Sequence, residues 1–222
     1  MTHPPRIVPA VGPIIDELLA RLFPATCVGC GAMPTGLCDA CRASLVPPPA
    51  VPPPVGIDWW TACWAYAGPV REVVARAKYR GARAALAALV PDLVAALGGI
   101  PVRPDVVTWA PASATRRSAT GVDHARILAR GAAFGLALPV RPLLRRSPGP
   151  PQTGGSVADR RIGPALRSCG RVSGATVLVV DDVATTGATL ASAARALRAA
   201  GATRVVGATL TRTPVRTPMF RR

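Results

Sequence analysis

The sequence is poor in acidic residues, aromatic residues and lysine. Its 222 residues include only 11 aspartates and glutamates, the aromatic residues make up 4%, and Lys78 is the only lysine. The 27 basic residues are therefore almost all arginine, and the formal net charge is +16. This charge suits phosphorylated or nucleic-acid partners, but an excess of arginine, alanine and proline is also typical of a genome composition bias. The charge alone therefore selects no function.

The sequence also lacks long apolar runs. No stretch approaches the roughly 18 uninterrupted apolar residues of a membrane span. The apolar pattern of residues 11–24 is interrupted by Asp16 and Glu17 and has no basic leader, which is not typical of a signal peptide. We therefore expect a cytoplasmic protein without membrane insertion, in which cysteines are thiols or metal ligands rather than disulfides.

Two classes of protein are excluded by motifs that are missing. The chain contains no G-x-x-x-x-G-K-[ST] run, which excludes an ATP-type P-loop. A response-regulator receiver domain also begins with an apolar strand ending in two aspartates, but it needs a further aspartate and a lysine downstream. No Asp, Glu or Lys follows Asp182, so the receiver interpretation fails.

Half of the residues are apolar, and strand-like and helix-like segments alternate along most of the chain. This alternation predicts an α/β fold, with a parallel sheet flanked by helices. The proline at position 91 should kink or split the helix that contains it, and the prolines in 138–144 make a strand there unfavourable. The predicted strands are 59–66, 105–111, 175–181 and 203–211, and the predicted helices are 13–23, 69–81, 82–97, 123–138 and 189–200.

A proline-rich segment suggests how the chain is divided. PPPAVPPP, residues 47–54, favours an extended conformation and is interpreted as a spacer. The predicted parts are an N-terminal helix and cysteine module in 1–46, a linker in 47–56, the α/β domain in 57–213 and a tail in 214–222.

The stretch VLVVDDVATTGATL, residues 177–190, places Asp181 and Asp182 directly after an apolar run. Such a run is typical of a central parallel strand, so the aspartates are expected at its carboxyl end, the edge where open α/β sheets bind ligands. The small residues that follow lead into a helix whose N-terminal amides and dipole suit a phosphate monoester. Gly187 permits a close approach or a positive φ. Because carboxylates accept hydrogen bonds from sugar hydroxyls, the pattern predicts a sugar-phosphate site. A helix cap would explain only one of these residues.

Four cysteines form two C-x-x-C pairs separated by seven residues. Four thiols so close together in a cytosolic chain fit a closed tetrahedral Zn²⁺ site, which would also supply folding energy to a small segment. A rubredoxin-like iron site and a pair of disulfides are the alternatives. Cys63 and Cys169 are isolated and are expected to be small buried apolar residues. The predicted metal ligands are Cys27, Cys30, Cys38 and Cys41.

Residues 177–189 closely resemble the phosphoribosyl pyrophosphate signature of type I phosphoribosyltransferases: an apolar strand, two acidic residues, an apolar residue, then T-T-G-[AST]-T. The resemblance implies that Asp181 and Asp182 hold the ribose hydroxyls in the catalytic site. It also implies that the following loop holds the 5′-phosphate. The loop residues assigned to the substrate are Val183, Ala184, Thr185, Thr186, Gly187, Ala188 and Thr189.

A four-cysteine knuckle ahead of this signature resembles the ComF family of competence-associated, phosphoribosyltransferase-like proteins. The K-Y-[KR]-G element of that family appears at 78–81, its V-P-V-P-like turn resembles TWAPAS at 108–113, and its R-x-x-x-x-Q loop is approximated from Arg146 to Gln152. Two departures lie on the expected pyrophosphate side. ATGVDHA, residues 119–125, replaces R-G-F-N-Q, and Ile162 with Gly163 stands where an asparagine is expected.

The resemblance implies an enzyme that displaces pyrophosphate from phosphoribosyl pyrophosphate, with Mg²⁺ neutralising the leaving group, and transfers the phosphoribosyl group to an acceptor. The loop at 147–156 would close as a lid, and no general base is assigned. His124 is expected to be a helix-surface or capping residue. The family also implies a link to DNA uptake, with single-stranded DNA or a DNA-uptake helicase as a partner. The residues expected to face pyrophosphate are Pro111, Ala112, Ser113 and Arg117, helped by Arg116.

A second interpretation is a non-catalytic protein that uses the same fold to bind single-stranded nucleic acid. The charge of +16 and a possible aromatic platform favour it, whereas an aromatic content of 4% counts against it. Affinity that falls steeply with salt would distinguish it from the enzyme. The residues of this possible platform are Trp59, Trp60, Trp64 and Tyr66.

Overall fold

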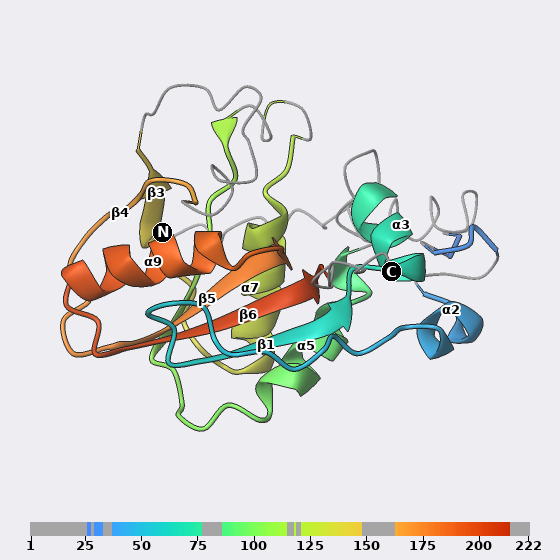
Figure 1. Cartoon of the computed structure of the whole chain (residues 1–222), viewed down its shortest axis with the longest axis horizontal. Coiled ribbons are helices and arrows are strands. Elements are labelled where there is room, and N and C mark those ends of the chain that lie inside the picture. The colour runs from blue at the N-terminus through green and yellow to red at the C-terminus, as the bar shows by residue number, and fades with distance from the viewer. Residues whose placement is uncertain are drawn as a thin grey trace, which may run out of the picture.

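A four-stranded parallel sheet forms the centre of the molecule (Figure 1). The computed structural model describes residues 26–27, 29–32, 37–76, 86–114, 118, 121–147 and 163–213. The spatial order β1-β6-β5-β2 places β5 and β6 in the middle, each with a neighbour on both sides. The strands are β1 (Trp59–Ala65), β2 (Val106–Trp109), β5 (Thr176–Ala184) and β6 (Arg204–Arg212).

Helices cover both faces of this sheet, as the alternation of segments predicted. On one face α5 (Val90–Leu97) and α7 (His124–Gly135) pack on Leu178 and Val180 of β5. On the other face α9 (Ala188–Ala199) packs on Val177 and Val179 of the same strand. Figure 1 shows α9 on the opposite side of the sheet from α5 and α7. Burial of β5 on both faces explains why its sequence is continuously apolar.

The two helices on the α5 side approach each other closely. A Cβ atom at Gly131 of α7 would lie 2.6 Å from the methyl carbons of Val90 in α5, so glycine at this position allows the contact. The helix predicted for 82–97 is divided, because α5 begins at Val90 with Pro91 in its first turn, where a proline needs no amide partner. Among the described residues, no helix has the length and apolar character needed to cross a membrane.

A small antiparallel pair lies beside α9. It joins β3 (Leu144–Arg146) to β4 (Leu166–Ser168), and Leu144 and Leu166 belong to the same buried cluster as the inner face of α9. The sequence predicted no strand in either place. The segment 138–144, whose prolines make a strand unfavourable, forms an isolated bridge between Val107 and Val140, and only its last residue, Leu144, belongs to β3.

The cysteine segment packs on the α5 face of the sheet. It includes the short helix α2 (Asp39–Ala43), and helix α3 (Gly68–Arg76) follows β1. Leu37 and Leu45 share a buried cluster with residues of α5, and Arg42 donates a 2.7 Å hydrogen bond to Asp92 of that helix. The predicted helix at 13–23 and the tail from 214 lie outside the described residues.

The proline-rich segment runs as extended chain along β1 and β6. The backbone N–H of Ala65 donates to the carbonyl of Val46 at 2.7 Å, and Trp60 Nε1 donates to the carbonyl of Val51 at 3.4 Å. Arg212 of β6 donates to the carbonyl of Pro49 at 2.9 Å. We call residues 46–57 the strap. These contacts hold it against the sheet, and the domain boundaries proposed from the sequence remain a prediction.

Candidate functional site

The two aspartates lie within β5, just past the point where its neighbour β2 ends. Trp109, the last residue of β2, pairs with Val180, and the N–H of Ala110 donates to the carbonyl of Val180 at 3.0 Å. The sequence predicted that the strand would end at 181, but β5 continues to Ala184 because it still pairs with β6 there. The carboxylates therefore lie at a step in the carboxyl edge of the sheet, where β5 extends past the end of β2.

Both carboxyl groups are largely enclosed. Asp181 is 8% exposed and Asp182 is 7% exposed. Each carboxylate accepts the backbone N–H of the following residue, at 2.8 Å for Asp181 and at 2.9 Å for Asp182. Because side chains alternate along a strand, Asp181 shares the α9 face with Val179, whereas Asp182 shares the α7 face with Val180. A ligand that contacts both would therefore approach the part of β5 that extends past the end of β2.

The loop after β5 has the geometry of an anion cradle. Gly187 has φ +75° and occupies the N-cap position of α9, whose first amides point out of the helix. The hydroxyl of Thr186 accepts the N–H of Ala188 at 3.3 Å, and both Thr185 and Thr186 are exposed. The positive end of the helix dipole and these amides suit a phosphate group, as the sequence predicted.

The strap reaches this cradle. A Cβ atom at Gly187 would lie 2.7 Å from Cγ of Pro54, so the proline packs directly on the glycine. Further along α9, the hydroxyl of Ser192 donates to the carbonyl of Pro164 at 2.5 Å. Glycine is therefore required at 187 for two reasons, its backbone angle and its close neighbour.

The turn after β2 is held from two sides. Arg146 Nε of β3 donates to the carbonyl of Pro111 at 2.8 Å, and the N–H of Ala112 donates to Asp123 Oδ2 at 3.2 Å. Since Ala110 bonds to Val180 of β5, this turn lies close in space to the aspartates, and its assignment to pyrophosphate remains a prediction. Arg116, Arg117 and most of the proposed lid, from residue 148, lie outside the described residues.

The prediction that His124 lies on the helix surface or caps the helix was wrong. This residue is 5% exposed rather than on the helix surface, and its Nδ1 lies 3.4 Å from Asp182 Oδ2. A local pattern could not reveal this contact, because it joins the start of α7 to a strand 58 residues later in the sequence. The prediction for Cys169 was also wrong, because this residue is exposed and the sequence predicted a buried one.

The tryptophans do not form an open aromatic platform in β1. Trp59, Trp64 and Tyr66 pack against the α5 side of the core, and Trp60 packs against the α9 side. Trp60 is further covered by Arg212, whose guanidinium carbon lies 5.6 Å from the ring centre. Burial lowers the pKa of Arg212 below its ordinary value. The aromatic residues are therefore mainly structural.

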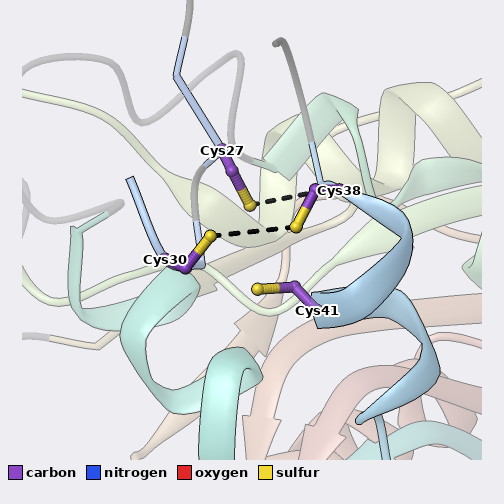
Figure 2. A group of neighbouring side chains, drawn as sticks. All are labelled: Cys27, Cys30, Cys38 and Cys41. Carbon is purple, nitrogen blue, oxygen red and sulfur yellow. Dashed lines mark hydrogen bonds between the residues drawn. The ribbon is translucent and has the colours of Figure 1, made fainter. Parts of the chain in front are cut away.

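The four predicted metal ligands come together, as Figure 2 shows. Their sulfur atoms all lie within 4.8 Å of one another, and Cys30 Sγ is 3.8 Å from Cys38 Sγ. A tetrahedral metal with bonds of about 2.3 Å to sulfur requires sulfurs about 3.8 Å apart, so the geometry fits zinc. All described cysteines are free, which contradicts the disulfide alternative.

The cluster also has the local features of a metal knuckle. Gly31 has φ +81°, and its N–H donates to the carbonyl of Cys27 at 2.8 Å, which closes a tight turn. The N–H of Cys38 donates to Cys27 Sγ at 3.3 Å. Burial raises the pKa of the Cys27 thiol, but backbone N–H groups, that of Cys38 first, outweigh it and lower the value to about 6. Burial and the neighbouring sulfurs raise the pKa of Cys41 to about 12.

The parallel sheet with helices on both faces is an α/β fold like that of the type I phosphoribosyltransferases. Residues 120–220 match the family model described as a phosphoribosyl transferase domain. This match includes α7, β5, α9 and β6, and so carries the aspartates and the cradle. A search among curated proteins found no match.

Several solved structures are similar to parts of this chain. The structure of an allosteric regulatory enzyme of purine biosynthesis is 25% identical, with a TM-score of 0.38, over 62% of this chain and 26% of that one. A purine phosphoribosyltransferase from Pyrococcus horikoshii is 21% identical over 57% of this chain and 73% of that one, with a TM-score of 0.39. An adenine phosphoribosyltransferase from Thermoanaerobacter pseudethanolicus is 16% identical over 64% and 84%, respectively, with a TM-score of 0.39. This chain thus spans about a quarter of the length of the first of these proteins.

Proposed function

We propose that this protein binds phosphoribosyl pyrophosphate with Mg²⁺ and transfers its phosphoribosyl group to an acceptor. The observation that carries the proposal is the placement of two enclosed carboxylates next to the N-terminus of α9, at the carboxyl edge of the sheet. Ribose hydroxyls would donate to Asp181 and Asp182, and the 5′-phosphate would accept hydrogen bonds from the amides that follow Ala184.

The same arrangement suits the chemistry at C1 of the ribose. The bond from C1 to the diphosphate oxygen breaks, and pyrophosphate leaves with the electron pair. A lone pair of the acceptor forms the new bond to C1, and the acceptor's proton passes to solvent. The negative charges of Asp181 and Asp182 favour the positive charge that develops on the sugar. The negative charge of the leaving group would be neutralised by Mg²⁺ bound with the substrate. The turn of Pro111, Ala112 and Ser113 lies beside this position and would face pyrophosphate.

The four cysteines are assigned to a structural zinc ion in this proposal. Closed four-cysteine sites of this geometry hold zinc without an open position for substrate, so the metal would stabilise the fold rather than take part in the reaction. The free thiols also fit the cytoplasmic location expected from the sequence, where cysteines stay reduced.

A thermal-shift titration tests the proposed ligand. A ligand that binds only the folded protein raises its stability, by about 2.7 kcal/mol at a concentration of 100 Kd. For a chain of this size we expect the melting temperature to rise by about 5 to 10 °C with phosphoribosyl pyrophosphate and Mg²⁺. The Asp181→Asn and Asp182→Asn variants should each lose most of this shift, because an amide presents one acceptor and no charge to the ribose.

A matched control lies just before β2, next to the first residue of β5. Asp105 Oδ2 accepts the N–H of Thr176 at 2.7 Å, at the opposite edge of the sheet. The Asp105→Asn variant also removes one carboxylate and should keep the full ligand shift. Wild-type protein that shows no saturable shift would refute the proposal.

A second function is supported by a basic groove on the outer side of α9. The groove has a volume of about 590 Å³ and lies between β4, its following turn and the C-terminal half of the helix. Among the described residues, none of its three arginines forms an ion pair with a carboxylate. These arginines are Arg167, Arg171 and Arg195.

This groove suits the phosphates of single-stranded nucleic acid, in the ComF-like role linked to DNA uptake that the sequence suggested. The test is binding of a labelled oligonucleotide at several salt concentrations. The Arg167→Ala variant, with Arg195→Ala, should weaken binding and flatten its salt dependence, whereas Asp182→Asn should not. Oligonucleotide affinity that is unchanged by the arginine substitutions would eliminate the groove as the binding surface.

A further inference from the structure

The first turn of α7 lies between the two halves of the candidate site. Asp123 and His124 stand where the sequence departs from the family pattern that it resembles, and the sequence assigned neither of them a role in the site. One half of the site is the turn at 111–113, and the other is the carboxylate of Asp182. Each half is contacted by one of these two adjacent residues.

Asp123 occupies the N-cap position but does not cap its own helix with its side chain. Its Oδ2 instead accepts the N–H of Ala112 at 3.2 Å. Its Oδ1 is buried and has no hydrogen-bond partner among the described residues. An aspartate at the N-cap usually accepts hydrogen bonds from the first amides of its own helix. Because Asp123 bonds to the turn instead, we infer that it holds that turn.

His124 makes the corresponding contact on the other side. It is almost fully buried, and Nδ1 lies 3.4 Å from Asp182 Oδ2. The other oxygen of that carboxylate, Oδ1, accepts the N–H of Val183 at 2.9 Å. With one oxygen bonded to the backbone and the other facing the imidazole, the carboxylate group of Asp182 is restricted in rotation.

The turn is also fixed from the side opposite α7. Arg146 Nε donates to the carbonyl of Pro111 at 2.8 Å, while Asp123 receives the next amide along the chain. Because Asp123 and His124 are adjacent at the start of one helix, the distance between the turn and Asp182 is set by that helix.

We propose that Asp123 and His124 are positioning residues, with Asp123 fixing the pyrophosphate half of the site and His124 orienting Asp182 in the ribose half. The inference rests on the proposed function, because it assigns one ligand group to each half. Neither residue is required to contact the substrate or to take up a proton in the reaction.

The two halves can be tested separately with ribose 5-phosphate and with pyrophosphate and Mg²⁺, both titrated calorimetrically into the full chain. The His124→Ala variant should lower the affinity for ribose 5-phosphate by about tenfold, the usual effect of one lost hydrogen bond. Its affinity for pyrophosphate should stay within about twofold of the wild-type value. The Asp123→Ala variant should show the reverse. The His124→Gln and Asp123→Asn variants keep a donor and an acceptor, respectively, and should restore most of the lost affinity.

The controls separate positioning from a general loss of structure. Arg130→Ala changes an exposed residue of the same helix and should alter neither affinity, and urea unfolding reports the stability of every variant. If each alanine variant lowered the affinity for both ligands equally, or if the conservative variants restored no affinity, this inference would be overturned but the proposed function would stand. Wild-type protein that binds neither ligand would overturn the proposed function and this inference with it.

Discussion

Gly187 combines two constraints at one residue of the cradle. Its φ of +75° is unfavourable for any residue with a Cβ, and Pro54 occupies the place where that Cβ would lie. Gly174 has the same φ of +75°, but nothing lies within 4 Å of a Cβ added there. The two glycines therefore differ in the close contact and in their distance from the candidate site.

Alanine substitutions at these glycines separate the two effects. Both should cost about 1–2 kcal/mol of unfolding free energy from the left-handed backbone alone. We expect Gly187→Ala to lower the melting temperature further than Gly174→Ala and to abolish the shift given by phosphoribosyl pyrophosphate, whereas Gly174→Ala should retain that shift. Equal losses of stability and ligand response in the two variants would contradict the role of Gly187.

The two cysteines outside the cluster should differ in reactivity. Burial, together with the nearby charge of Asp92, raises the pKa of Cys63 to about 12, so its reactive thiolate is scarce at pH 8. Cys169 is exposed beside β4. Iodoacetamide should therefore modify Cys169 in the folded protein and Cys63 only after unfolding, as peptide mass spectrometry would show. Rapid labelling of Cys63 in folded protein would show that its environment is more open than described.

At the scale of elements, the cysteine cluster should bind metal in a pH-dependent way. Cys41, with a pKa of about 12, must lose a proton on binding zinc at any ordinary pH, so affinity rises with pH. Cys27, with a pKa of about 6, is ionised at pH 7 and becomes protonated below pH 6. Zinc affinity should thus fall at least tenfold per pH unit and more steeply below pH 6, as competition with a chromogenic chelator would measure. Affinity independent of pH would contradict thiolate ligation.

The central elements were predictable from local sequence to within a few residues. The apolar run of β5 and the glycine before α9 give strong local signals for a buried strand and a helix start. The extension of β5 to Ala184 was not predictable, because it depends on pairing with Thr211 and Arg212 of another strand. The contacts of His124 and Asp123 were missed for the same physical reason, since burial and partners arise from packing between distant segments.

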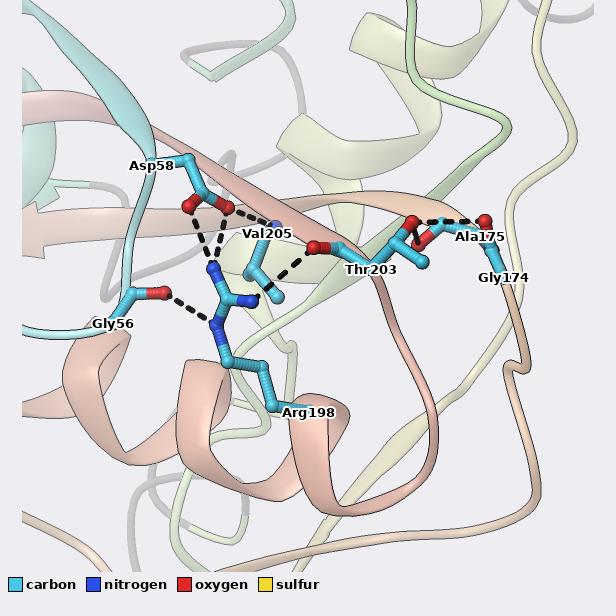
Figure 3. A network of polar contacts seen from close by, with 7 residues as sticks. All are labelled: Gly56, Asp58, Gly174, Ala175, Arg198, Thr203 and Val205. Carbon is cyan, nitrogen blue, oxygen red and sulfur yellow. Dashed lines mark hydrogen bonds and ion pairs between the residues drawn. The ribbon is translucent and has the colours of Figure 1, made fainter.

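At the scale of the whole molecule, one polar network joins the strap, the sheet and α9. In Figure 3, Arg198 of α9 donates to both oxygens of Asp58 and to the carbonyl of Gly56. The same carboxylate accepts the N–H of Val205 in β6 at 2.7 Å, and Arg198 also donates to the carbonyl of Thr203. The Arg198–Asp58 pair is about 40% exposed, with side-chain values of 38% and 40%, so its contribution depends mainly on the backbone groups that it satisfies.

The Asp58→Ala variant should destabilise the protein by about 1–2 kcal/mol, because it removes the acceptor of the Val205 N–H as well as the exposed ion pair. This corresponds to a melting temperature lower by about 2 to 8 °C. Glu72→Ala, which removes an exposed acidic residue of α3, serves as the control and should change the melting temperature little. A variant as stable as the control would show that the network contributes nothing.

The strand order has a consequence for how the chain is made. Of the described strands, β6 leaves the ribosome last, yet it lies between β1 and β5, and its residue Val205 bonds to Asp58 across 147 positions of sequence. The sheet therefore cannot form by adding strands one after another at its edge, because β6 must insert between β1 and β5 after both have been synthesised. Until that insertion, β1 and β5 each carry an unpaired side able to attract other nascent chains. Productive folding therefore follows translation of the last strand, and chaperone protection should matter most just before it.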